Sequence, residues 1–231
     1  MTATTALSVE QPQPEVAAES IGQPSRNNGE ASAVVIACSA VLREVLAVTR
    51  ANDWSHIETK TITSELHNRP EKIPDAVKEL IDEAKQKGQQ IFVAYGDCGT
   101  GGRLDALLEQ EGVERIPGAH CYEFYSGREQ FSQFHEAELG TFYLTDFLVR
   151  HFDRLVIRGL GLDRKPELLP LYFGHYTKLL YIAQSVDPAL QEQAKAAAEQ
   201  LGLAYEHYQG GSGDMGPALH DFNRRIAVEL K

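Results

Sequence analysis

The chain has 231 residues, which is enough for one α/β domain or for two small lobes that share a cleft. Its formal net charge is −11, with 22 Lys and Arg against 33 Asp and Glu, and this balance argues against nucleic acid as a partner. No apolar stretch approaches the ~20 residues of a membrane span, and the first residues lack the apolar core of a secretory signal. We therefore expect a cytoplasmic protein with no membrane partner.

Two regions differ in composition. Residues 1–32 are rich in Pro, Gln, Ser and Ala and have little aliphatic periodicity, which predicts a disordered N-terminal tail. Residues 33–231 are predicted to form a single α/β domain, either as one body or as two lobes around a cleft.

The first predicted elements alternate between strand and helix. We expect a strand at 33–37, a helix at about 41–48, an amphipathic strand in IETKTITSEL, a helix from Pro74 to about Gly88, and the apolar strand IFVAY. This order is typical of an open, mostly parallel sheet with flanking helices, in which the carboxyl ends of the strands line a ligand cleft.

The rest of the domain continues this alternation less regularly. The pattern predicts a helix at 104–112, a short strand at 113–116, a helix capped by Ser126 with Glu129, a strand turning into a helix in FYLTDFLVRHF, and no settled element at 155–157. Near the end it predicts the strand LLYIAQ, a helix capped by Asp187, the strand LAYEHYQ, and a last helix at about 216–230.

The most informative residues are the three cysteines of the chain, each placed after a predicted strand: Cys38, Cys98 and Cys121. Because ligands bind at the carboxyl ends of strands in an open α/β sheet, these thiols are expected to converge on one metal site. No C-x-x-C pair is present, so any site must be assembled by the tertiary structure. Three thiolates suit an iron–sulfur cluster with one open iron or, alternatively, zinc, with His120 as a fourth ligand or as a hydrogen-bond donor.

The second cysteine lies in the loop G-D-C-G-T-G-G, between a strand and a helix. The N–H groups of such a loop can hold an anion, so Gly96, Gly99, Gly101 and Arg103 are candidate cofactor-binding residues. The spacing departs from the dinucleotide-binding and P-loop patterns, and simple turn formation is the competing interpretation. The helix N-terminus also favours a thiolate at Cys98.

Several motifs together resemble a known family: a strand ending in AC, then YGDCG, PGAHCYEFYSG, GTFYLTDF and a late GDMG. The family is the bacterial and archaeal domain of unknown function 1638, and the resemblance spans roughly residues 33–231. It implies a Cys at each of the three positions found here. Genes of the family tend to lie near corrinoid-dependent methyltransferases, so the resemblance implies a supporting role in one-carbon methyl transfer, with a corrinoid protein or methyltransferase as partner.

These observations give one main hypothesis and two alternatives. The main hypothesis is a metal- or iron–sulfur-binding protein that uses the three thiols in support of corrinoid-dependent methyl transfer. The first alternative is a metal-free accessory module that binds a small molecule or corrinoid through the glycine loop and the aromatic segment LYFGHYTKLLYI. The second is an enzyme with Cys98 as nucleophile and His120 or His175 as base.

Overall fold

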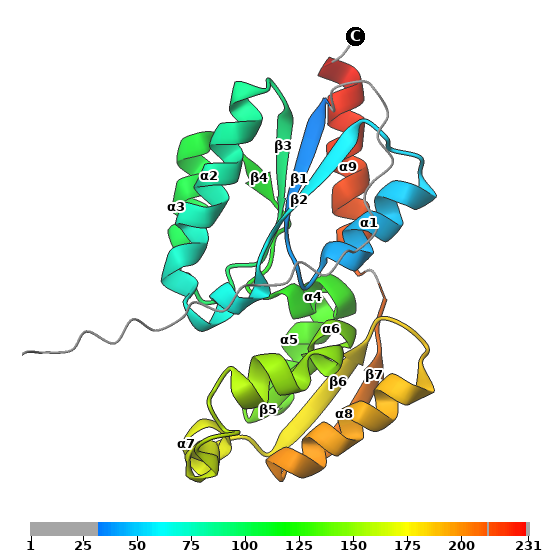
Figure 1. Cartoon of the computed structure of the whole chain (residues 1–231). Helices are drawn as coiled ribbons and strands as arrows, with labels where there is room; N and C mark the ends of the chain where they lie inside the picture. Colours follow the sequence, from blue (N-terminus) through cyan, green and yellow to red (C-terminus); the bar gives the residue numbers. More distant parts are fainter. Residues whose placement is uncertain (1–31, 212, 230–231) are drawn as a thin grey trace, which may run out of the picture.

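The computed structural model describes residues 32–211 and 213–229 and shows an α/β fold with two parallel sheets (Figure 1). The N-terminal sheet has the order β2-β1-β3-β4 and the C-terminal sheet the order β5-β6-β7. The strands are β1 Ala33–Cys38, β2 Ile57–Ile62, β3 Gln90–Ala94, β4 Glu114–Arg115, β5 Thr141–Thr145, β6 Lys178–Ala183 and β7 Ala204–Gln209. The predicted α/β class with parallel strands is confirmed, and the strands form two lobes.

Helices cover both faces of the N-terminal sheet: α2 and α3 lie on one side, and α1 and α9 on the other (Figure 1). In the C-terminal lobe α8 packs on β6 and β7, while α4 contacts β6. The α-helices are α1 Leu42–Ala51, α2 Ile73–Gln86, α3 Arg103–Glu111, α4 Cys121–Ser126, α5 Arg128–Ala137, α6 Asp146–Arg150, α7 Leu169–Phe173, α8 Pro188–Leu201 and α9 Met215–Glu229. Short 3-10 turns are η1 Ser64–Asn68, η2 Pro70–Lys72 and η4 Pro166–Leu168, and η3 Asp153–Arg158 is a π-helix.

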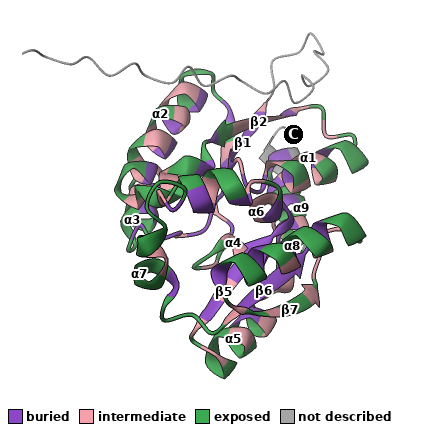
Figure 2. Cartoon of the chain, turned by 60° about the horizontal axis from the view of Figure 1, so that its bottom comes forward, coloured by how far each residue is buried: buried purple, intermediate pink, exposed green. Residues whose placement is uncertain are grey.

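The central strands are buried on both faces, as parallel strands covered by helices must be (Figure 2). Side chains of β6 alternate between two cores because successive residues of a strand point to opposite faces. Leu180 and Ile182 pack in the core shared with the N-terminal lobe, whereas Leu179 and Tyr181 pack in a second core under α8. The lobes are therefore joined by continuous apolar packing.

The chain crosses between the lobes twice. It leaves the N-terminal sheet through α4 and α5 to reach β5, and it returns after β7 as α9 (Figure 1). α9 places Leu219, Phe222 and Ile226 in the core of the N-terminal lobe, where the Phe222 ring stacks on Phe92 at 5.1 Å. The predicted stripe of this last helix is confirmed at these positions, and Leu230 lies outside the described residues.

The helix predicted to follow Ser126 is present as α5, with Phe131 buried, but the predicted capping residue was wrong because Gly127 holds the N-cap position. Ser126 does not cap a helix but ends α4, where its hydroxyl donates to the carbonyl of Tyr122 at 3.1 Å. The preceding helix α4 begins after His120, whose backbone N–H donates to the Glu123 carboxylate at 3.3 Å. Asp187 caps α8 as predicted, accepting from the N–H of Ala189 at 3.0 Å.

The predicted N-terminal tail lies almost entirely outside the described residues. Of the predicted tail 1–32, only Ser32 lies within the described residues. Within 32–211 and 213–229, no helix has both the length and the apolar character needed to cross a bilayer. The unsettled segment 155–157 lies inside the π-helix η3, a conformation often found at functional sites.

Candidate thiol site

The three cysteines converge from three separate segments. Cys38 ends β1, Cys98 lies in the loop after the neighbouring strand β3, and Cys121 begins α4. The first two share one edge of the sheet because β1 and β3 are parallel neighbours. Cys121 does not directly follow a strand, but its thiol hydrogen-bonds Cys98 and its charge would act on Cys38 as well. The three thiols are thus one electrostatically coupled group.

Cys98 has the features of a stabilised thiolate. Hydrogen bonds from the Cys121 thiol, His120 and His67 hold the pKa of Cys98 well below its usual range, against the opposing effect of burial. The hydrogen bond to Cys98 raises the pKa of His120. Burial lowers the pKa of His67, but the hydrogen bond to Cys98 and the charge of Cys98 outweigh it, so the net shift is upward. Cys98 also has a left-handed backbone, with φ +47°, which is uncommon for a residue with a side chain.

The other two thiols stay protonated in this arrangement. Burial raises the pKa of Cys38 to about 12, although the N–H of Ala40 donates to its sulfur at 3.4 Å. The hydrogen bond to Cys98 and burial raise the pKa of Cys121 well above its usual range. A single negative charge on Cys98 therefore suppresses ionisation of its neighbours.

The hydroxyl of Tyr95 lies beside this group and is buried. Its polar neighbour is the Cys38 thiol, which interacts with it electrostatically, but no group in the described part of the chain gives it a hydrogen bond of good geometry. Buried polar atoms without a partner are rare in proteins and often mark a place where a ligand or ion belongs.

A cavity of about 260 Å³ opens beside the thiols, between the two lobes. Cys98, at 9% exposure, lies in its wall, and the more exposed His67 and His120 stand at its mouth. Most of the remaining wall is apolar and comes from both lobes: Ala40, Ser64, Asn68, Cys121, Tyr122, Tyr125, Phe142, Thr145, Phe147, Leu148, Leu155, Val156 and Leu160. Cys98 thus faces a small, largely apolar space.

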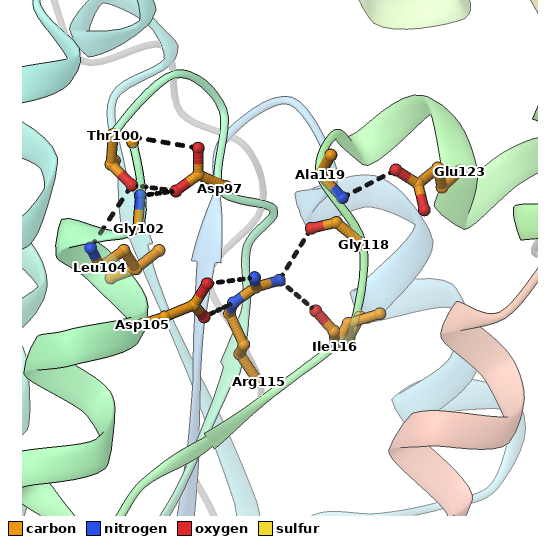
Figure 3. Close-up of polar contacts among 11 residues, drawn as sticks. Asp97, Thr100, Gly102, Leu104, Asp105, Arg115, Ile116, Gly118, Ala119 and Glu123 are labelled. Atoms are coloured by element: carbon orange, nitrogen blue, oxygen red, sulfur yellow. Dashed lines mark hydrogen bonds and ion pairs between the residues drawn. The ribbon is translucent and has the colours of Figure 1, made fainter. Parts of the chain in front are cut away.

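The glycine loop before α3 is organised around Asp97 (Figure 3). Its carboxylate accepts from the N–H groups of Gly101 and Gly102 at 3.1 and 2.9 Å, and from the hydroxyl of Thr100. These hydrogen bonds lower the pKa of Asp97, although burial opposes them. Arg103 donates to the carbonyl of Thr100 at 2.8 Å. The carboxylate thus takes the loop's N–H groups that a bound anion would use, and a cofactor-binding role for Gly101 and Arg103 stays a prediction.

The two other candidate glycines have distinct surroundings. A Cβ on Gly96 would lie 3.1 Å from the backbone Cα and C of His120, so this glycine lets the segment carrying Cys121 approach β3 closely. Gly99 has φ +85° and would contact only the ring of Pro70. Neither observation requires a bound cofactor, and their predicted role is likewise open.

The segment that presents His120 and Cys121 is fixed at both ends (Figure 3). On one side, Arg115 forms a two-point ion pair with Asp105 at 2.6 and 2.9 Å and donates to the carbonyls of Ile116 and Gly118. On the other side, the buried Glu123 carboxylate accepts from the N–H groups of Ala119 and His120 at 2.7 and 3.3 Å. These contacts hold the backbone of the loop that precedes Cys121.

Sequence reasoning missed His67. It lies in η1, beyond the carboxyl end of β2, with its Nδ1 2.9 Å from the carbonyl of Ser64 and its ring stacked on Tyr95. The strand-end rule that singled out the cysteines points to the same edge, but the four residues between β2 and His67 hide the relation. His175, the other base considered, precedes β6 and does not line the cavity.

A metal ion requires several ligand side chains that surround one point. Within residues 32–211 and 213–229, no three His, Cys, Asp or Glu side chains surround a single point as ligands of one metal ion would. The group nevertheless brings together residue types that soft metals prefer, since the Cys98 thiol is hydrogen-bonded by the Cys121 thiol and by the imidazoles of His120 and His67. The iron–sulfur and zinc assignments therefore stay predictions.

Comparison with known proteins gives a family but no described relative. No curated protein and no solved structure matches the chain. A family model described as "Protein of unknown function (DUF1638)" matches residues 61–219, a range that contains Cys98 and Cys121 and begins after Cys38. Since the match covers more than half of the sequence, the chain belongs to the DUF1638 family.

Proposed function

We propose that the chain holds an iron–sulfur cluster, or alternatively zinc, on Cys38, Cys98 and Cys121, with His120 as a further ligand or hydrogen-bond donor. The observation that carries the proposal is the convergence of the three thiols of the chain, from separate segments, on one site beside a cavity. Convergence of this kind is not required for packing, because a cysteine used only as a small apolar residue has no need of another thiol nearby.

Each residue has a separate part in this proposal. The thiolate of Cys98 supplies the first ligand, and binding of the centre would offset the cost of ionising Cys38 and Cys121. His67 and His120 donate hydrogen bonds that lower the charge on sulfur. A bound centre with an open coordination position would transfer electrons, or it would act as a Lewis acid on a small molecule held in the apolar cavity.

The biological setting in the proposal is corrinoid-dependent methyl transfer in the cytoplasm, and it rests on the family resemblance. The cavity of about 260 Å³ is at the small end of ligand pockets and suits a one-carbon donor, not a corrin ring. A corrinoid would therefore be met on a partner protein docked at the mouth of the cleft. Equilibrium dialysis against free methylcobalamin should show no tight binding; tight binding would favour the accessory-module alternative.

The decisive experiment is metal and acid-labile sulfide analysis, with a visible spectrum, on protein purified without oxygen. We expect iron with sulfide in the wild type and its loss in Cys38→Ser, Cys98→Ser and Cys121→Ser, because a hydroxyl does not replace a thiolate ligand. His175→Gln, which changes a histidine away from the cavity, should keep its metal. Zinc without sulfide would support the zinc form, and full metal retention in all three Cys variants would refute the proposal.

A second candidate function is favoured by one specific observation, the thiolate of Cys98 between two histidines on a left-handed backbone. In this case Cys98 is the nucleophile of a covalent reaction, and His120 or His67 moves the proton. Purified protein without metal, treated briefly with iodoacetamide at neutral pH, should then carry one adduct, on Cys98. Equal labelling of Cys98 and Cys38 would exclude this candidate.

A further inference from the structure

A second cavity, of about 310 Å³, adjoins the thiol pocket where α1 of the N-terminal lobe faces α6 of the C-terminal lobe. Ala40 and Phe147 line both cavities, so the two cavities are neighbours. The new cavity contains neither a cysteine nor any of the residues proposed above as ligands. Its wall is formed by Ser39, Ala40, Leu42, Arg43, Glu44, Leu46, Arg50, Asp146, Phe147, Arg150 and His151.

Three guanidinium groups line this cavity, which is notable in a chain of net charge −11. Arg43 and Arg50 are seven residues apart on α1 and therefore lie on one face, two turns apart. In the part of the chain that the structure describes, neither has a carboxylate within ion-pair distance. Arg150 on α6 has a loose pair, 3.7 Å from Asp187, with 38% of its side chain exposed.

The two acidic residues of the cavity are already engaged by the protein. Asp146 is buried and accepts from the hydroxyl of Tyr181 at 2.7 Å and from the N–H of Gln184 at 2.9 Å. Glu44 accepts from the hydroxyl of Tyr125 at 3.3 Å, and burial raises its pKa. The two carboxylates thus have hydrogen-bond partners inside the fold. The guanidinium groups of the three arginines still have N–H donors that can bind a ligand.

We propose that this cavity binds the anionic group of a small ligand, a carboxylate or a phosphate, through Arg43, Arg50 and Arg150. The planar guanidinium matches the geometry of both groups and forms paired, charge-assisted hydrogen bonds with them. Two arginines from α1 and one from α6 approach the anion from both lobes, so binding would also tie the lobes together. The proposal concerns this cavity alone and holds whether or not the thiols bind a metal.

The test is isothermal titration of the full chain, at low ionic strength, with inorganic phosphate, pyrophosphate and succinate as probes. We expect saturable binding of at least one probe and at least tenfold weaker binding in Arg43→Gln, Arg50→Gln and Arg150→Gln, since each removes a charge-assisted contact. Arg164→Gln is the matched control, because Arg164 is 79% exposed, lies outside this wall, and approaches only Asp163, at 3.9 Å. Binding of phosphate or pyrophosphate alone assigns a phosphate ligand, and binding of succinate alone assigns a carboxylate.

Two outcomes would overturn the proposal: no saturable binding of any probe, or binding that all three cavity variants leave unchanged. Melting curves of the variants check that they fold, which is expected because these side chains are exposed at the cavity wall. Metal analysis of the same samples separates this proposal from the proposed function. Cys38→Ser should lose metal and keep the anion, whereas Arg50→Gln should keep metal and lose the anion.

Discussion

The two lobes share an architecture but use the carboxyl ends of their strands differently. In the N-terminal lobe, the ends of β1 and β3 present Cys38 and Cys98, whose sulfur atoms face other titratable groups. In the C-terminal lobe, the end of β5 presents Asp146, which is buried and saturated by donors from β6 and the loop after it. The same topological position thus supplies reactive groups in one lobe and structural bonds in the other.

The difference shows that position in a parallel sheet is not enough to identify a functional residue. The lobes differ in whether the polar group at the strand end has all of its hydrogen bonds satisfied within the fold. The Asp146 carboxylate has four donors, from Tyr181, Gln184 and two atoms of Ser185. The Cys98 thiolate instead depends on histidines that reach the mouth of a cavity. Four experiments could break or sharpen this contrast.

The largest effect is expected for Asp146→Ala, which leaves several buried donors without an acceptor. We expect the free energy of unfolding to fall by about 3 kcal/mol or more, as measured by urea denaturation. Asp153→Ala is the control, since the Asp153 side chain is 70% exposed and pairs with the exposed Arg158, and its effect should stay under about 0.5 kcal/mol. Cys98→Ser should cost about 1 kcal/mol or less. Equal losses in Asp146→Ala and Cys98→Ser would mean that both strand ends are structural.

The second effect concerns the close approach at Gly96. The added methyl group of Gly96→Ala would press on the backbone of His120, which Arg115 and Glu123 hold in place. We expect a loss of about 1 to 3 kcal/mol in unfolding free energy, together with slower alkylation of Cys98 as the thiols are pushed apart. Gly211→Ala is the control because a Cβ there would meet nothing within 4 Å. A loss no greater than that of the control would show that the segment moves freely.

The third effect is the pH dependence of Cys98 in metal-free protein. Because its pKa is lowered, the thiolate persists as pH falls below 8, and alkylation should slow only as pH passes through the lowered pKa. His67→Gln and His120→Gln remove hydrogen bonds to the thiolate, so the pKa should rise toward its usual value and the rate at pH 6.5 should drop about tenfold.

Two comparisons complete this pH experiment. Cys38, whose pKa is raised to about 12, should remain unlabelled at neutral pH, and His175→Gln should leave the profile of Cys98 unchanged. Labelled peptides separated by mass spectrometry give each rate. A profile for Cys98 centred near the ordinary thiol pKa, unaffected by either histidine, would contradict the hydrogen bonding described here.

Much of the fold could be predicted because local periodicity and burial agree. β1, β3 and β6 are continuous apolar runs, as expected of strands covered on both faces, and α8 begins at a capping Asp187 followed by Pro188. The division into two sheets could not be predicted in the same way. Which strands pair depends on contacts between distant segments, such as those of α4 with β6, and periodicity carries no information about them.

The candidate site could be predicted only in part. The strand-end rule located Cys38 and Cys98, whose neighbours in the sheet follow from the strand order. Cys121 was also expected at a strand end, but it begins α4, and its approach depends on Gly96 and on the anchored loop before α4. His67 was missed because a 3-10 turn, not a strand, brings it to the cavity. Ser126 was misassigned because α4 extends through it, so the next helix begins one residue later with Gly127 at its N-cap.

The smallest effect is expected for an ion pair between the two lobes. Arg154 of the π-helix lies 3.8 Å from Glu65 of η1, and about half of each side chain is exposed. Such pairs contribute little because water screens them, so Arg154→Ala should change the unfolding free energy by about 0.5 kcal/mol or less. A double-mutant cycle with Glu65→Ala isolates the pair. A coupling energy above about 1 kcal/mol would contradict this expectation. It would mean that the ion pair, as well as the shared apolar core, holds the two lobes together.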